Sequence, residues 1–309
     1  MRAPLSLFST LPSAAMLALA PLALATLTLA TLTLALPGVA HAEDGDEPVP
    51  VTSTSAPVKP GPATATVTSV YDGDTFTLDT GDRVRLRWVN TPEMKPHEDY
   101  GPEARDFSAS LLQGKQVELL YGKTLRDGYG RLVAGVIVDG KNLSIELLRQ
   151  GFAHMFVIPP DATDLKPFIA AQEAARVARR GIWSTSRYQG ALHITSFHAN
   201  ADGDDRENVN GEYLRVCNVS PDPIDLSGYY ITDISGNKFT FPQVVVPAGF
   251  TFKLHSGKGE NAVDTQAQIT VHLQSADPIW NNKLDRASIY DRYGRVVDAR
   301  DHSVDKESP

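Results

Sequence analysis

The sequence predicts two folded bodies in tandem: a mixed α+β body followed by an all-β body. A chain of 309 residues is long enough for about two domains at roughly 150 residues each. Strand-like and helix-like patterns alternate between residues 63 and 188, whereas only short β-like runs follow residue 190. We therefore expect the first body at 63–188 and the second at 191–303.

Residues 1–42 have the pattern of a secretory signal peptide. Arg2 is followed by a long apolar run that ends in Ala40-His41-Ala42, with small residues at the −3 and −1 positions. The alternative is an uncleaved anchor, because the run approaches the roughly 20 residues that span a bilayer. Pro21 inside the run and the acidic residues after it favour cleavage after Ala42. We expect a secreted, extracellular protein with no membrane segment after cleavage.

Residues 43–62 are acidic at first and then rich in proline, with five prolines in 20 residues. This composition predicts a disordered linker.

Cys217 is the single cysteine, which excludes an intramolecular disulfide and a metal site made of several thiolates. We expect Cys217 to be a small buried side chain in a β-like run.

The first body is predicted to contain five strands and three helices. Asp-Gly and Thr-Gly-Asp turns separate its first strands, and Gly151 and Gly181 end two of the helices. The expected strands are 64–70, 75–79, 83–89, 116–121 and 132–138, and the expected helices are 102–112, 143–149 and 164–180.

The second body is predicted to be a β-sandwich or barrel. Short β-like runs recur at about 8–12 residues, separated by turns rich in glycine, asparagine and proline. The expected strands are 192–197, 212–217, 228–232, 238–241, 251–255, 267–272, 287–290 and 296–299.

Four motifs in the first body carry groups that could act in chemistry. Asp72-Gly73-Asp74-Thr75 places two carboxylates in one turn, and Asn90-Thr91-Pro92-Glu93 directly follows a strand. Asp127-Gly128-Tyr129-Gly130-Arg131 is a glycine-rich turn that ends in an arginine. Arginines alternate with apolar residues over 83–88, which predicts three guanidiniums on one strand face. Taken singly, each motif also fits a hairpin turn, a solvated face or a helix start.

Together, the motifs supply what phosphodiester hydrolysis needs. That reaction requires a hard cation, a carboxylate that activates or orients water, and guanidiniums that hold the developing charge. Carboxylate, amide and carbonyl oxygens are ligands that suit Ca²⁺. The candidates are Asp74, Asn90 and Thr91 for the metal, Glu93 for the water, and Arg85 and Arg131 for the phosphate.

These motifs, in their order and spacing, resemble the staphylococcal nuclease (thermonuclease) family over about residues 64–186. Tyr100-Gly101-Pro102-Glu103-Ala104 and Gly181-Ile182-Trp183-Ser184 extend the resemblance. It implies a five-stranded barrel of the OB type with three helices. It also implies a Ca²⁺-dependent nuclease that acts on DNA and RNA and leaves 3′-phosphate ends.

The resemblance assigns a role to each candidate residue. Asp74 would be the carboxylate calcium ligand and Thr91 would lend its carbonyl, with Asp72 supporting the site from nearby. Glu93 would be the general base or the group that orients the water. The residues at the phosphate would be Arg85 and Arg131, which stabilise the pentacoordinate phosphate, and Tyr129 beside it.

The chain departs from the family at two places. Asn90 stands where the best-known members have a second calcium-binding aspartate, so we expect weaker calcium binding without necessary loss of activity. The stretch after Gly151 lacks the tyrosines that the family packs on the base. Phe156 is then either a stacking surface for a base or a core residue.

The second body resembles the lamin-tail domain, an immunoglobulin-like β-sandwich that bacteria append to exported enzymes. The motifs are short and include Asp225-Leu226-Ser227-Gly228-Tyr229 and Tyr290-Asp291-Arg292-Tyr293-Gly294. The resemblance implies a binding or positioning module, with a protein or a cell-envelope component as its ligand. We expect the acidic loop 202–207 to be a solvated loop, and we assign no histidine to a metal.

The leading hypothesis is an exported calcium-dependent nuclease that works as a monomer. One alternative is an OB-fold module that binds nucleic acid but has weakened or lost cleavage, because Asn90 replaces an aspartate. Another makes the second body an adhesive or matrix-binding domain.

The net charge of −8 does not oppose a nuclease, since residues 63–188 hold 16 basic and 16 acidic side chains. The acidity belongs to the linker and the second body.

Overall fold

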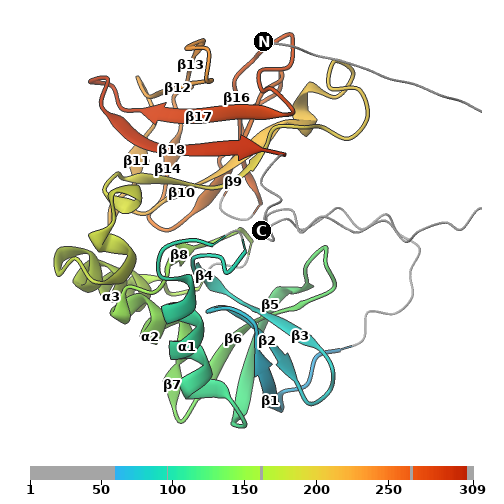
Figure 1. Ribbon diagram of the computed structural model, residues 1–309, viewed down its shortest axis with the longest axis vertical. Coiled ribbons are helices and arrows are strands. Elements are labelled where there is room, and N and C mark those ends of the chain that lie inside the picture. The colour runs from blue at the N-terminus through green and yellow to red at the C-terminus, as the bar shows by residue number, and fades with distance from the viewer. Residues whose placement is uncertain (1–59, 96, 161–162, 265–266, 305–309) are drawn as a thin grey trace, which may run out of the picture. The chain divides into compact units, whose positions relative to one another are not determined.

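The computed structural model describes residues 60–95, 97–160, 163–264 and 267–304 (Figure 1). All of these residues belong to one compact unit, residues 43–309. The predicted signal peptide and most of the predicted linker lie outside the described residues. Within the described ranges, no helix combines the length and hydropathy needed to cross a membrane.

The first body is built on a closed five-stranded barrel. Neighbouring strands pair in the order β3-β2-β1-β5-β6, and β3 pairs in parallel with β6 to close the ring. Alternate side chains such as Val67, Phe76 and Leu132 fill the interior and are at most 1% exposed. The strands are β1 (Thr64–Val70), β2 (Thr75–Leu78), β3 (Arg83–Leu86), β5 (Gln116–Arg126) and β6 (Leu132–Val138).

The strand predicted at 83–89 is interrupted. It forms β3 and then β4 (Trp88–Asn90), because Trp88 adopts a φ of 69° in the left-handed region. The Trp88 ring packs edge-on against Phe168 at 5.2 Å. It also covers Gly135, where a Cβ would lie 2.4 Å from the ring, so the glycine makes room for the indole.

This break changes the expected arrangement of three guanidiniums on one strand face. Arg83 is exposed, whereas Arg85 and Arg87 are each only 7% exposed. The Arg87 guanidinium lies over the Trp88 ring, 4.4 Å from its centroid. The physical reason is the turn at Trp88, which removes Arg87 from the strand alternation that the sequence pattern assumes.

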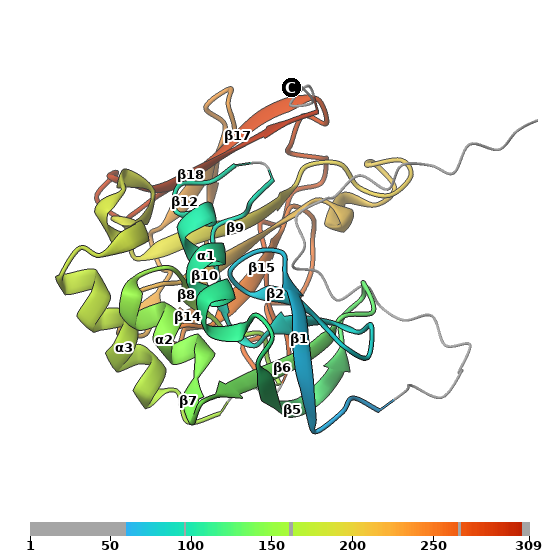
Figure 2. The same cartoon turned by 60° about the horizontal axis from the view of Figure 1, so that its bottom comes forward.

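Three helices accompany the barrel, as predicted: α1 (Gly101–Leu112), α2 (Leu143–Gln150) and α3 (Lys166–Val177). Helix α2 is capped by Asn142, whose side chain accepts from the Ile145 N–H, and it ends at Gly151 with a φ of 75°. Helix α3 is shorter than the expected 164–180. Figures 1 and 2 show α2 and α3 side by side. The remaining elements here are β7 (Lys141–Asn142), β8 (His154–Phe156), η1 (Gly181–Ser184) and η2 (Ser186–Tyr188).

The second body is a β-sandwich of two four-stranded sheets, which confirms the expected immunoglobulin-like architecture. One sheet has the order β16-β15-β10-β9 and the other β13-β12-β17-β18. Buried side chains from both sheets form the core, including Val216, Phe252, Ile231 and Ile289. The strands are β9 (Leu192–His198), β10 (Tyr213–Asn218), β12 (Tyr230–Thr232), β13 (Lys238–Thr240), β15 (Thr251–His255), β16 (Ile269–His272), β17 (Leu284–Tyr290) and β18 (Val296–Ser303).

The short strands β11 (Ile224–Asp225) and β14 (Val245–Val246) form a separate pair that the sequence patterns did not predict, and η3 (Val209–Gly211) precedes β10. Cys217 is fully buried, as expected. Its Sγ donates to the carbonyl of Met155 at 3.0 Å.

Strand β8 links the two bodies through main-chain hydrogen bonds. It pairs with β4 on one side, with Asn90 opposite His154. Just beyond it, the Val157 N–H donates to the Gly249 carbonyl at 2.9 Å, and the Thr251 N–H donates to the Val157 carbonyl at 3.0 Å. The strand that follows Arg85 is therefore connected to the sandwich through a single intervening strand.

Candidate active site

The turn between β1 and β2 buries two carboxylates. Asp72 is 6% exposed and Asp74 is 4% exposed. Oδ1 of Asp72 accepts from the N–H groups of Asp74 at 3.0 Å and Thr75 at 2.5 Å, which fixes the turn. Burial, followed by the negative charge of Asp74, raises the pKa of Asp72 to about 7. A positive charge near this turn therefore favours the ionised form of Asp72.

Asp74 contacts the segment that follows β4. Its Oδ2 accepts from the Thr91 N–H at 2.8 Å and from the Thr91 hydroxyl at 3.1 Å. A Cβ on Gly73 would lie 2.6 Å from Cγ2 of Thr91, so a glycine is needed for this close approach. The fold thus joins two of the predicted motifs that are 17 residues apart.

Arg85 lies between Asp74 and Asn90. Its Nη1 is 3.3 Å from Oδ2 of Asp74, and its Nη2 donates to Oδ1 of Asn90 at 2.6 Å. Nη1 also donates to the carbonyls of Leu86 at 2.7 Å and Val89 at 2.9 Å. Four oxygen atoms hold the guanidinium in a buried site. Its positive charge partly neutralises the two carboxylates of the β1–β2 turn.

Arg131 is oriented by Asp127 at the other end of the glycine-rich turn. Oδ2 of Asp127 accepts from Nε of Arg131 at 2.6 Å, and Oδ1 accepts from the N–H groups of Tyr129 and Arg131. The Arg131 guanidinium lies 5.4 Å from the centroid of the Tyr129 ring, which is 49% exposed and open to a ligand. Asp127 belongs to a motif that the sequence singled out, but its role in orienting Arg131 emerges only from these contacts.

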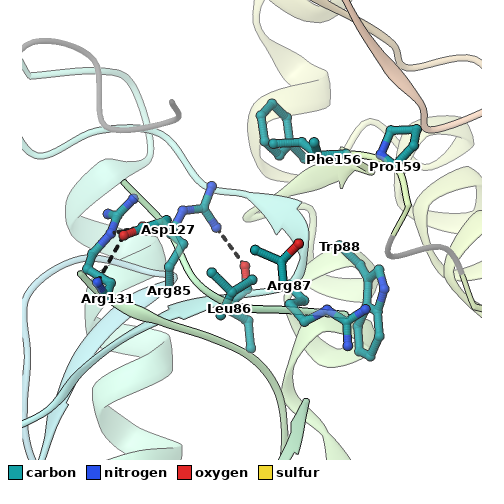
Figure 3. Close-up of a pocket in the computed structure, with 11 residues that line it drawn as sticks. Arg85, Leu86, Arg87, Trp88, Asp127, Arg131, Phe156 and Pro159 are labelled. Atoms are coloured by element: carbon teal, nitrogen blue, oxygen red, sulfur yellow. Dashed lines mark hydrogen bonds and ion pairs between the residues drawn. The ribbon is translucent and has the colours of Figure 1, made fainter. Parts of the chain in front are cut away.

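Arg85 and Arg131 line one pocket of about 130 Å³ (Figure 3). Its aromatic and apolar walls include Trp88, Val133, Phe156, Ile158 and Pro159. Phe156 is 6% exposed and its ring centroid lies 5.8 Å from the Arg85 guanidinium. Phe156 is thus a packed side chain that also forms a pocket wall, and the stacking of a base on it stays a prediction. The pocket can accept an anionic group at the two arginines and an apolar or aromatic group beside them.

Glu93 lies in the loop between β4 and α1, where its residue is half-buried. Its N–H donates to Oε2 of Glu98 at 3.0 Å, and its carbonyl accepts from the Glu98 N–H at 3.0 Å. Oε1 of Glu98 accepts from Nη1 of Arg187 at 2.7 Å. No local pattern in the sequence indicates a role for Glu98, because its partner Arg187 lies 89 residues away.

The predicted metal ligands offer a donor set suited to a hard cation. They are the carboxylate of Asp74, the amide oxygen of Asn90 and the carbonyl of Thr91, and the oxygen of Asn90 is already directed at a cation, Arg85. A calcium ion would compete with that guanidinium for oxygens of Asp74 and Asn90. Across the described ranges, no group of three or more His, Cys, Asp or Glu side chains could hold a metal. A calcium ion held by these residues would have one carboxylate and two neutral oxygens as ligands, a set that is typical of weaker binding.

A pH prediction arises from Glu98. Burial opposes ionisation of this carboxyl, but the positive charges of Arg187 and Arg300 outweigh it and lower its pKa below the ordinary value of 4.5. Because the folded-state pKa is lowered, the stabilisation is complete above pH 4.5 and is lost as the pH falls below it. We expect Glu98→Gln to lower the free energy of unfolding by about 1–3 kcal/mol near neutral pH.

Urea unfolding at a series of pH values measures this effect. The difference between the parent protein and Glu98→Gln should shrink as the pH falls below about 4.5. A difference that stays constant down to about pH 3 would contradict the assigned ion pairs.

Family models match both bodies. The model described as "Staphylococcal nuclease homologue" matches residues 83–185, and the model described as "Lamin Tail Domain" matches residues 185–303. These matches confirm both resemblances seen in the sequence motifs.

Similar proteins carry nuclease names. Endonuclease YncB of Bacillus subtilis is 34% identical over 132 residues, covering 40% of this chain and 63% of that protein. The SPbeta prophage-derived endonuclease YokF of the same organism is 33% identical, with 45% of its length covered, so the chain spans less than two thirds of both Bacillus proteins. The thermonuclease of Staphylococcus intermedius is 33% identical over 124 residues, covering 38% of this chain and 74% of that protein. The chain belongs to the staphylococcal nuclease family.

Proposed function

We propose that this protein is a Ca²⁺-dependent nuclease that hydrolyses phosphodiester bonds of DNA and RNA and leaves 3′-phosphate ends. The main observation behind this proposal is the pocket that Arg85 and Arg131 both line, with the buried carboxylate of Asp74 next to Arg85. The names of the similar endonucleases and thermonucleases support the same reaction class.

In the proposed reaction, a water oxygen bonds to phosphorus while the bond from phosphorus to the 5′ oxygen breaks. Glu93 takes the proton of the water, and the 5′ oxygen leaves as a hydroxyl after it takes up a proton from the solvent. Arg85 and Arg131 donate to the phosphate oxygens, on which negative charge increases in the transition state. Tyr129 lies beside Arg131 and is exposed enough to contact the same phosphate.

Asp74, Asn90 and Thr91 would hold the calcium ion, with Asp72 supporting Asp74 through the turn. When bound, the ion would supply positive charge that polarises the phosphoryl group.

A cleavage assay with a Ca²⁺ titration tests the proposal. Purified, folded protein should degrade plasmid DNA, single-stranded DNA and RNA in the presence of Ca²⁺, and a chelator should stop the reaction. End-group analysis should find 3′-phosphates. Absence of calcium-stimulated cleavage over a wide range of Ca²⁺ concentrations would refute it.

A second candidate function is nucleic-acid binding with weakened or lost cleavage. The observation that favours it is the hydrogen bond from Arg85 to the neutral Asn90, which occupies a predicted calcium ligand. Binding of DNA in millimolar Ca²⁺ without turnover would support this function over the first.

Asn90→Asp distinguishes these functions, because it adds a carboxylate next to Asp74. We expect the Ca²⁺ concentration at half-maximal stabilisation to fall about tenfold, since ligand charge tunes calcium affinity. Thermal melting in a Ca²⁺ titration measures the change, and the cleavage assay shows whether activity rises with it. Gln243→Glu is the matched control, because it adds the same charge at an exposed position of the sandwich. Equal Ca²⁺ affinities for Asn90→Asp and Gln243→Glu would remove Asn90 from the ligand set.

We further propose that residues 1–42 direct export and that the exported protein begins at Glu43, which N-terminal sequencing of the exported protein tests. The supporting observation is the pattern of one charge, an apolar run and Ala40-His41-Ala42. We propose the sandwich as an accessory module for a protein or cell-envelope ligand, in a monomeric enzyme.

A further inference from the structure

Glu98 closes the loop that carries Glu93. Its carboxylate accepts from the Glu93 N–H, and its own N–H donates to the Glu93 carbonyl. Both bonds are 3.0 Å long, and the Glu98 side chain is only 12% exposed. The main chain of the proposed general base is therefore held on both sides by one residue.

The same carboxylate contacts two arginines from outside that loop. Nη1 of Arg187, in η2, lies 2.7 Å from Oε1, and Nη1 of Arg300, in β18 of the sandwich, lies 3.8 Å from it. Arg300 is 13% exposed at its side chain and also donates to the Ile194 carbonyl of β9 at 3.3 Å. Because the side chains of Glu98 and Arg300 are largely shielded from water, their attraction is screened less than that of a surface pair.

A second connection reaches the start of the same loop. β4 ends at Asn90 and pairs with β8, and the residue after β8, Val157, exchanges main-chain hydrogen bonds with Gly249 and Thr251 of the sandwich. The segment from Asn90 to Glu98 is thus tied to the second body at both ends. One tie uses the main chain and the other uses charged side chains.

We propose that the β-sandwich positions Glu93 for catalysis through Arg300 and Glu98. Arg187 contributes to the same positioning, because it contacts the same carboxylate of Glu98. Glu98 and Arg300 are positioning residues, since each acts through the main chain of Glu93. The inference rests on the proposed function, and it gives the second body a part in the reaction apart from any ligand of its own.

The test uses the full chain with Arg300→Met, Arg300→Lys and Arg187→Met. Small displacements of a catalytic group can cost up to about 100-fold in rate, so we expect kcat to fall about tenfold in Arg300→Met with KM unchanged. Arg300→Lys keeps the charge and should recover most of the loss. In Arg187→Met, kcat should fall at least as much as in Arg300→Met, because Arg187 lies closer to Glu98 than Arg300 does.

Arg286→Met is the matched control. Arg286 is on β17 of the same sandwich and forms an ion pair with Asp301, in which both side chains are about half exposed. The Arg286→Met substitution should leave kcat, KM and the melting temperature unchanged. Melting of every variant shows that the fold persists.

Amide hydrogen exchange at Glu93 gives a readout that does not need activity. In Arg300→Met this amide should exchange about tenfold faster, because its acceptor Glu98 is held less firmly. If the parent protein cleaves nothing, the proposed function fails and the exchange rates alone decide the coupling. An unchanged Glu93 exchange rate, or a kcat within twofold of the parent in folded Arg300→Met, would overturn the inference.

Discussion

Replacing Glu93 by glutamine is expected to lower kcat by about 10²–10⁴-fold, the range that a general base contributes. The amide keeps the shape of the side chain but cannot accept a proton from water. The loop should keep its form, because Glu98 holds the main chain of residue 93 and not its side chain. Single-turnover cleavage at saturating DNA and Ca²⁺ measures the chemical step directly.

The control for this prediction is Glu103→Gln, since Glu103 is an exposed carboxylate in the first turn of α1. It should cleave at the parent rate. A loss of less than tenfold in Glu93→Gln, with an unchanged melting temperature, would reject Glu93 as the base.

Replacing Arg85 by methionine is expected to impair both stability and activity. The variant leaves the buried Asp74 carboxylate without its cation, and removal of one partner from a buried pair costs about 3–5 kcal/mol. Loss of a donor to the transition-state phosphate should also lower kcat by about 10²–10³-fold. Chemical unfolding in a chelator and cleavage at saturating Ca²⁺ measure the two effects separately.

Arg83→Met provides the comparison, because Arg83 lies two residues earlier on β3 and is exposed over the Tyr71 ring. It should change the free energy of unfolding by less than about 0.5 kcal/mol, as is usual for a surface substitution. If Arg83→Met and Arg85→Met were equally stable, the buried pair with Asp74 would have no energetic weight.

Arg85 and Glu98 show how burial changes the role of a charged residue. An arginine in an alternating strand is normally solvated, yet Arg85 is enclosed by four acceptors and carries the site. Glu98 occupies an unremarkable acidic loop in the sequence, yet it joins the Glu93 main chain to two distant arginines. Both acquire a role because the fold removes them from water, where their charges interact strongly.

The sequence by itself determined an α+β body followed by an all-β body and most of the candidate residues, and the family resemblance implied the closed barrel. Strand alternation, glycine turns and helix stops act over a few residues, so they predicted the five barrel strands, the three helices and the main sandwich strands. The order of the motifs around Asp74, Asn90 and Arg131 also predicted the family. Local patterns suffice here because they reflect the period of each element and the chemistry of short turns.

Only the tertiary structure decided where the strand breaks at Trp88, which oxygens surround Arg85, and what holds Glu93. The left-handed turn at Trp88 depends on the space above Gly135, 47 residues further along the chain. The contact of Glu98 with Arg187 spans 89 residues, and its contact with Arg300 joins two different bodies. Such contacts depend on which surfaces pack together, and the residue spacing within one element carries no information about that packing.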